Sequence, residues 1–355
     1  MPFNDANAPS PLGLTAHEFA RAHARIPGGA ADAYRRLFRD GDATALPGLT
    51  LPEPARVQRS QSPEGEVVKF VLRVPPNLET ESVLIPMVGR TRGRTYTLCV
   101  SSQVGCAMGC TFCETAQMGL LRSLTPAEIV AQWFAATHHL RLRPKNIVFM
   151  GMGEPLDNLA GVLAAIRALT DHLGAAHPMS RIVVSTVGRL DGLARLAAQV
   201  REPGWHRLGL AVSINAPNDQ IRSRIMPINR AMPMAALREA LLAWPIFGAA
   251  KICLEYVLIP GVNDATEHAR ELASWARPLP ACINVIPYNP RRDSPWPAPD
   301  EASVDHFLGD LVAAGAYCKR RRTKGREMMG ACGQLGNPQL RRPRLVRLGA
   351  PASSP

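Results

Sequence analysis

The pattern of apolar and polar residues changes twice along the chain. From residue 14 to about 50, apolar residues recur at helical spacing, for example at Phe19, Ala22 and Ile26, and turns rich in proline and glycine interrupt them. From about 66 to 100, short segments of alternating apolar residues replace this pattern. The first region predicts a small helical module, and the second predicts a β-hairpin or a small antiparallel sheet.

Beyond residue 96, apolar strand candidates alternate with amphipathic helix candidates. This order predicts a parallel sheet wrapped by helices, which makes the chain an α/β protein. About six such units form a partial (β/α)6 TIM-like barrel, shorter than the eight units of a closed TIM barrel. The expected strands are 96–100, 146–150, 181–185, 208–214, 252–259 and 282–288, and the expected helices lie near 126–140, 157–173, 190–200, 233–243 and 265–276.

Charge sets the C-terminal part of the chain apart. The formal net charge is +12, and between Lys319 and Arg347 ten basic residues face a single acidic one, Glu327. Such a charge favours a polyanionic partner, nucleic acid above all, although a solvated basic tail is the simpler alternative. We expect four parts: an N-terminal helical accessory module over 1–60, a β extension over 61–95, the partial barrel over 96–318 and a basic C-terminal segment over 319–355.

The composition indicates the cellular location of the protein. The 355 residues, 46% of them hydrophobic, suffice for a large core. The first residues lack both a basic region and an apolar stretch, and no segment has about 18 consecutive apolar residues. We therefore expect a cytoplasmic protein that is neither secreted nor membrane-bound. In that setting the eight cysteines indicate metal or redox chemistry rather than a disulfide scaffold.

Three of these cysteines stand close together after the first barrel strand. Cys106, Cys110 and Cys113 have the spacing C-x3-C-x2-C. Thiolates suit iron-sulfur clusters, and three ligands on a four-iron cubane leave one iron open. An open iron can bind the amino and carboxylate groups of S-adenosylmethionine and cleave it to a radical. Ordinary buried thiols, or a zinc site completed by Cys99 or His138, are the alternatives, but the chain lacks the second C-x2-C pair typical of zinc sites.

Polar residues follow the other barrel strands. Gly151-Met-Gly-Glu154 after the second strand allows a close backbone approach and supplies a carboxylate for an ammonium group, although Glu154 could also be a helix-capping acid. Each of the polar residues that follow the later strands is, taken singly, more often a turn residue than a ligand. Because the carboxyl ends of parallel strands meet at one edge, we expect them together as an adenosylmethionine site. The candidates are Gly153, Glu154, Ser185, Ser213, Ile214, Asn215 and Asn289.

Two further cysteines lie outside apolar surroundings. Cys99 ends the first barrel strand, and Cys332 lies in the loop Gly330-Ala-Cys-Gly333 after the basic run. A thiol beside many arginines should have a lowered pKa, so we expect Cys332 to be a nucleophile. The sequence assigns the other three, Cys253, Cys282 and Cys318, to the core.

From Glu81 to Leu335 the sequence resembles the RlmN/Cfr class of radical S-adenosylmethionine RNA methyltransferases. The resemblance is carried by motifs in the same order along the chain: Glu81-Ser-Val-Leu-Ile-Pro86, Leu98-Cys-Val-Ser-Ser-Gln-Val-Gly-Cys106, Cys110-Thr-Phe-Cys113, Gly151-Met-Gly-Glu-Pro-Leu156, Ser185-Thr186, Asn215-Ala-Pro-Asn-Asp219, Pro227-Ile-Asn229, Glu255-Tyr-Val257, Val262-Asn-Asp264, Ile286-Pro-Tyr-Asn-Pro290 and Ala331-Cys-Gly-Gln-Leu335. The N-terminal helical segment is only loosely similar to the family's accessory domain.

The resemblance implies a radical SAM fold, a 4Fe-4S cluster on the cysteine triad and two adenosylmethionines per turnover. It implies that Cys332 is methylated first, that Cys99 helps to resolve a protein–RNA adduct through a transient disulfide with Cys332, and that Glu81 is a proton acceptor. Glu81 could equally be a strand-edge carboxylate. The product would be an adenine methylated at C2, or at C8 as in the Cfr type, in ribosomal or transfer RNA. A monomer and an electron donor such as flavodoxin or ferredoxin are also implied.

Three departures leave the substrate open. Asn215 stands where relatives commonly have histidine, the segment Arg326-Glu-Met-Met-Gly330 is less acidic than usual, and the stretch from Pro86 to Cys99 is longer than expected. Two rival functions are a radical SAM enzyme acting on a peptide or as an activase, which would not need Cys332, and an RNA-binding protein whose cluster is structural or a redox sensor.

Overall fold

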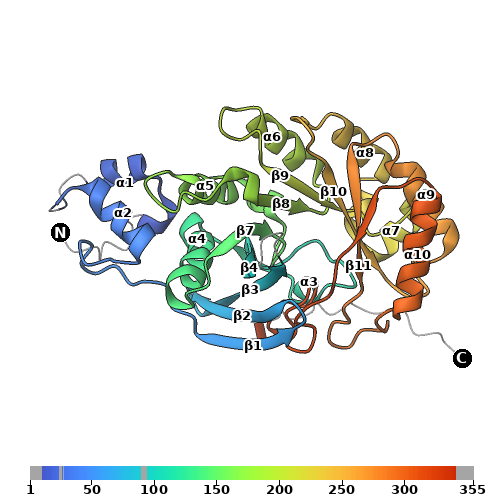
Figure 1. Ribbon diagram of the computed structural model, residues 1–355, viewed down its shortest axis with the longest axis horizontal. Coiled ribbons are helices and arrows are strands. Elements are labelled where there is room, and N and C mark those ends of the chain that lie inside the picture. Colours follow the sequence, from blue (N-terminus) through green and yellow to red (C-terminus); the bar gives the residue numbers. More distant parts are fainter. Residues whose placement is uncertain (1–9, 24–25, 27, 89–93, 341–355) are drawn as a thin grey trace, which may run out of the picture.

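A single ten-stranded sheet organises the computed structural model, which describes residues 10–23, 26, 28–88 and 94–340 (Figure 1). In spatial order its strands are β1 (Arg56–Ser62), β2 (Gly65–Val74), β3 (Leu78–Val88), β4 (Arg94–Cys99), β7 (Pro144–Phe149), β8 (Ile182–Thr186), β9 (Gly209–Ser213), β10 (Ile252–Leu258), β11 (Ala281–Pro287) and β12 (Cys318–Arg320). This order is linear, so within the described chain the sheet stays open between β1 and β12, as a partial barrel requires.

The strands from β4 to β12 pair in parallel and form the barrel part of the sheet. All six expected strands are present, which confirms the predicted α/β fold with a partial barrel. Helices follow one another around the outside of the strands (Figure 1). They are α4 (Pro126–Phe134), which continues as a π-helical turn to His139, α5 (Leu159–Thr170), α6 (Leu190–Val200), α7 (Asp219–Ile225), α8 (Met234–Leu242), α9 (Thr266–Ala276) and α10 (Glu301–Ala313).

Helix α10 and strand β12 are elements that the sequence analysis missed. The helix begins after Asp300, whose side chain accepts a hydrogen bond from the Ser303 amide, and it buries Val304, Phe307 and Leu311 at helical spacing. It leads directly into β12, which pairs in parallel with β11. The barrel part therefore has a seventh, short strand among the described residues.

The antiparallel strands β1, β2 and β3 extend the same sheet rather than forming a separate one. β3 pairs with β4, with Val83 opposite Cys99, and its other edge pairs with β2. Within the long stretch from Pro86 to Cys99, β3 runs to Val88 and β4 begins at Arg94, and these two strands pair antiparallel. The division of the chain into four parts remains a prediction.

Two helices, α1 (Ala16–Ala22) and α2 (Ala30–Asp40), form the N-terminal module. Thr15 and Glu18 form a capping box at the start of α1. The aromatic side chains of Phe19, Tyr34 and Phe38 are fully buried, and Phe38 stacks on Trp133 of α4 with ring centroids 6.2 Å apart. The module is therefore packed against the barrel helices. None of the helices in the described ranges has the length and apolar character needed to cross a lipid bilayer.

The described part of the basic segment is not a solvated tail, so that alternative is wrong for residues 319–326. Arg320 forms ion pairs with Glu301 and Asp305 on α10. Arg322 and Lys324 both contact Glu64, the residue before β2. The segment therefore packs back onto the sheet. The arginines at 341, 342, 344 and 347 lie outside the described residues.

Candidate active site

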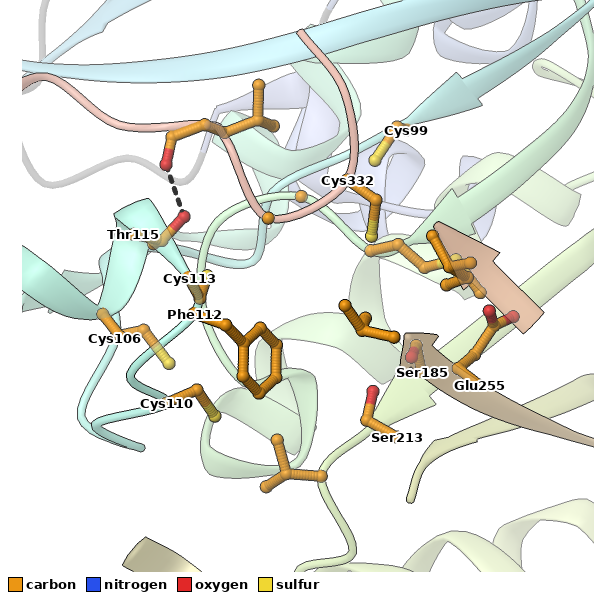
Figure 2. A pocket seen from close by; sticks show the side chains of 18 of the residues that line it. Cys99, Cys106, Cys110, Phe112, Cys113, Thr115, Ser185, Ser213, Glu255 and Cys332 are labelled. Carbon is orange, nitrogen blue, oxygen red and sulfur yellow. Dashed lines mark hydrogen bonds between the residues drawn. The ribbon is translucent and has the colours of Figure 1, made fainter. Parts of the chain in front are cut away.

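One cavity opens at the carboxyl ends of the parallel strands, and most of the predicted site residues line it (Figure 2). Parallel strands place the residues that follow them at one edge of the sheet, so side chains far apart in sequence meet there. The predicted residues found in its wall are Cys99, Cys106, Cys110, Cys113, Gly153, Glu154, Ser185, Ser213, Asn215, Asn289 and Cys332. Two predicted residues, Ile214 and Glu81, do not line it.

The cysteine triad lies in the loop after β4, between the short strand β5 (Gln103–Gly105) and the short helix α3 (Glu114–Gln117). β5 pairs with β6 (Leu120–Ser123) and closes the loop into a compact hairpin. Gly105 has φ +75°, and a Cβ there would lie 1.8 Å from the Gly119 carbonyl oxygen. The loop therefore needs glycine at this point to bring the three thiols to the cavity.

All three thiols are free, and burial raises the pKa of each. For Cys106 burial raises the pKa to about 12. The buried guanidinium of Arg222 is near Cys110 and lowers the pKa of that thiol, but by less than burial raises it. Arg222 is held by the backbone oxygens of Ile214, Val187 and Ser213 and by Asn229, so it is a fixed positive charge beneath the triad.

This donor set fits an iron-sulfur cubane better than a single metal ion. In the described residues, no three histidine, cysteine or acidic side chains converge on one point where a mononuclear metal could bind. A cubane instead takes each thiolate on a different iron, so its ligands surround a volume rather than a point. Three buried thiols around one cavity, with a fixed cation behind them, match that requirement.

Glu154 is the buried acid of the site. Its carboxylate accepts hydrogen bonds from the Leu156 amide at 3.0 Å and the Val187 amide at 2.9 Å. Burial raises its pKa to about 7, and these two hydrogen bonds limit the rise. The preceding Gly153 has φ +100°, and a Cβ there would lie 2.5 Å from the Cβ of Gln103. The turn is therefore tightly packed around a carboxylate that can receive an ammonium group.

The remaining predicted cofactor residues differ in what they can offer. Ser185 and Ser213 present hydroxyls to the cavity. Both backbone groups of Ile214 form hydrogen bonds within the fold. Its N–H donates to the backbone carbonyl oxygen of Glu255, and its carbonyl oxygen accepts from the Arg222 guanidinium. Asn215 has φ +52°, and its side-chain oxygen accepts from the Val257 amide at 2.9 Å. The amide of Asn215 thus ties β10 to the loop after β9.

Cys99 and Cys332 lie in the same wall of the cavity and are close enough to interact electrostatically (Figure 2). Burial raises the pKa of Cys99 to about 12 and raises the pKa of Cys332 as well. The expected lowering at Cys332 is therefore wrong, because protein surrounds the thiol and one cation, Arg321, offsets burial only in part. The chain holds both residues as free thiols.

Arg321 and Glu255 are functional candidates that sequence reasoning missed. Both line the cavity, with 3.9 Å between an Arg321 guanidinium nitrogen and a Glu255 oxygen. Glu255 also accepts hydrogen bonds from Asn284 at 2.9 Å and from the thiol of Cys253 at 3.3 Å. Burial lowers the pKa of Arg321, but nearby Cys332 and Glu255 outweigh burial and raise it. The sequence offered one sign of such a role, which is that Glu255 is an acidic residue inside an otherwise apolar strand.

Glu81 lies behind the Cys332 loop. The residue is buried, and it borders a second, polar groove together with Lys69, Met329 and Gly336. Its carboxylate lies 2.9 Å from the Lys69 ammonium and accepts a hydrogen bond from the Gly336 amide at 2.8 Å. Glu81 therefore does not line the cavity that holds Cys99 and Cys332.

Comparison with known proteins gives consistent matches. The family model of the radical SAM superfamily matches residues 100–273. A relative from Protochlamydia amoebophila, described as a probable dual-specificity RNA methyltransferase RlmN 1, is 42% identical over 86% of this chain and 83% of its own length. A dual-specificity RNA methyltransferase RlmN from Campylobacter jejuni is 40% identical over 79% of this chain and 80% of its own. A crystal structure of a radical SAM methyltransferase from Sphaerobacter thermophilus superimposes with a TM-score of 0.81 at 35% identity, covering 92% of this chain and 99% of that one.

Proposed function

The chain belongs to the RlmN family of radical SAM RNA methyltransferases, and from this premise we propose that it methylates C2 of an adenine in ribosomal or transfer RNA. The observation that carries the proposal is the meeting of two kinds of thiol in one cavity: the triad Cys106, Cys110 and Cys113, and the pair Cys99 and Cys332. A radical enzyme acting on another substrate would need only the first kind.

The cavity residues divide the work of holding the cofactors. Cys106, Cys110 and Cys113 would hold the 4Fe-4S cluster, and Glu154 would receive the amino group of adenosylmethionine. The hydroxyls of Ser185 and Ser213 and the amide of Asn289 suit its carboxylate or ribose. Together the two cofactors, when bound, supply a carbon-centred radical. Ile214 and Asn215 would act by shaping this wall, since their polar groups are largely engaged within the fold.

Cys99 and Cys332 would make possible a methylation that direct displacement cannot achieve. An adenine C2 is not nucleophilic, so it cannot take a methyl group by direct displacement. In the proposed sequence the Cys332 thiolate takes the methyl group first, and adenosylhomocysteine leaves. Once the methyl carbon on Cys332 has been joined to the base, the Cys99 thiolate attacks the Cys332 sulfur, so that an S–S bond forms as the S–C bond to the base breaks and the carbon takes up a proton. The reductant supplied to the reaction then returns the transient disulfide to two thiols. Their place in one wall supports this, because both must reach the same base. The role of Glu81 as proton acceptor, which the resemblance implies, stays a prediction.

Basic side chains beside Cys332 would attract the RNA. A small cavity lined by Arg321, Arg322 and Lys324 lies next to Cys332, and it shares Arg322 and Lys324 with a larger groove. Positive side chains suit the phosphate backbone, and a single base unstacked from RNA would have to reach Cys332. We also propose a cytoplasmic location, as the composition indicates. The resemblance alone supports a monomeric state and an electron donor such as flavodoxin or ferredoxin.

Anaerobic turnover with RNA tests the function. The iron-loaded protein is incubated with adenosylmethionine, a reductant and ribosomal or transfer RNA, and the digested RNA is analysed by mass spectrometry. We expect 2-methyladenosine, which disappears in the Cys110→Ala variant and in the Cys332→Ala variant. A product of 8-methyladenosine would point to the Cfr type instead. Cleavage of adenosylmethionine with neither RNA product would refute the assignment of RNA as substrate.

A further inference from the structure

The loop that carries Cys332 has almost no regular structure of its own. Between β12 and residue 337, the structure shows neither a helix nor a strand, and Met329 and Gly333 have positive φ angles of 53° and 82°. A segment without a hydrogen-bonded ladder depends on side chains from elsewhere for its position. The place of Cys332 is therefore set by whatever fastens this loop.

One buried ion pair is among the contacts that fasten the loop, and it acts on both sides of Cys332. The Lys69 ammonium donates a hydrogen bond to the Met329 oxygen at 3.1 Å, and the Glu81 carboxylate accepts one from the Gly336 amide at 2.8 Å. The two charges lie 2.9 Å apart, with side chains only 5% and 8% exposed. Because Lys69 and Glu81 come from the neighbouring strands β2 and β3, the sheet itself sets the spacing between the two attachments.

The loop separates the ion pair from the active site. Residues 330–333 and 335 line the catalytic cavity, whereas Met328, Met329, Gly336 and Asn337 line the polar groove behind it. Lys69 and Glu81 border this groove and do not line the catalytic cavity. Their contacts with Met329 and Gly336 reach Cys332 through the loop backbone.

We propose that Lys69 and Glu81 are positioning residues, which together form a latch that holds the Cys332 loop over the catalytic cavity. Removing one member leaves the other as a buried charge without its partner, which is costlier than removing both. The proposal concerns the position of the loop and holds whether or not Cys332 accepts a methyl group.

The test compares loop mobility in variants of the iron-loaded protein. Hydrogen exchange is measured over residues 325–337, and alkylation of Cys332 by iodoacetamide is measured on the tryptic peptide 327–341, in which Cys332 is the only cysteine. We expect Lys69→Met and Glu81→Gln each to raise the hydrogen-exchange rate of the loop and the alkylation rate of Cys332 by about tenfold or more. In the double variant the increase in both rates should be smaller than the sum of the two single effects, because neither charge is left without a partner.

Two further variants keep the result interpretable. Glu81→Asp retains the charge but shortens the side chain, so exchange should rise mainly at Gly336 even if the other variants fold poorly. Glu66→Gln removes a carboxylate from a different ion pair, which joins β2 to Arg59 of β1, and should change neither readout. If Glu81→Gln abolished RNA methylation while exchange and alkylation stayed within twofold of the native protein, Glu81 would act directly on substrate and the latch would be refuted.

Discussion

Arg321 lies where it can set the charge of both active-site thiols. It is the cation that lowers the pKa of Cys332 and of Cys99 against the effect of burial. Displacement on a methyl sulfonium needs a thiolate, so this charge bears directly on methyl acceptance. Glu255 and Met150 hold the guanidinium in place.

Replacing Arg321 should therefore slow the chemistry of Cys332. In Arg321→Met the pKa of Cys332 rises further, and alkylation of the peptide 327–341 at pH 8 should slow about tenfold for each unit of rise. Arg321→Lys keeps a positive charge and should recover most of the rate. Equal rates in the native protein and the methionine variant would show that another group controls the thiol.

Glu154 should make cofactor binding depend on pH. Burial raises its pKa to about 7, so the carboxyl loses its charge as the pH falls through that value. The charged form attracts the ammonium of adenosylmethionine, and affinity should fall about tenfold between pH 8 and pH 6. Equilibrium dialysis with the iron-loaded protein measures this. Glu154→Gln should bind weakly at both values, and a native affinity without pH dependence would contradict the assigned role.

Residue roles that follow from strand ends could be predicted from sequence, whereas roles that arise from long-range packing could not. Glu154 and Ser185 follow apolar strands, so the parallel topology brings them together. Arg321 gave no such signal, because it stands in a run of basic residues and only the pairing of β12 with β11 turns it toward Glu255. The raised pKa of Cys332 was missed for the same reason.

The elements themselves show a similar division. The six barrel strands were predicted because each is a short, largely apolar run that alternates with a helix candidate. Helix α10 lies within the predicted barrel range but was missed as an element, although Val304, Phe307 and Leu311 have the spacing of a buried helical face. The fastening of the Cys332 loop by Lys69 and Glu81 joins β2, β3 and the C-terminal segment, which no local pattern reveals.

The N-terminal module should contribute stability without contributing chemistry. Phe38 on α2 is fully buried against Tyr34 and Trp133, and none of the three lines the catalytic cavity. Phe38→Ala should lower the free energy of unfolding by about 3–5 kcal/mol. Urea unfolding followed by circular dichroism measures this, and methylation per folded molecule should stay unchanged. A loss below about 1 kcal/mol would mean that the module is only loosely docked.

At the scale of the whole molecule, the charge of +12 should appear as salt-dependent RNA binding. Much of the described basic segment is paired with acids. Arg322 also contacts Glu64, but 78% of its side chain is exposed, and it lines the small cavity beside Cys332. Arg322→Gln should reduce the slope of log affinity against log salt by roughly 0.7 to 0.9, the value of one phosphate contact. Arg195→Gln, on the exposed outer face of α6, is the matched control. A slope that is the same in Arg322→Gln and the native protein would remove Arg322 from the docking surface.

The transfer of one methyl group by way of Cys332 is the central claim, and an isotope chase tests it most directly. The protein is first incubated with adenosylmethionine carrying a labelled methyl carbon, freed of excess, and then given unlabelled adenosylmethionine, reductant and RNA for a single turnover. The account predicts that the label appears on the peptide 327–341 and then moves into the adenine of the RNA. An RNA methyl group without label, formed while the label stays on the protein, would contradict it.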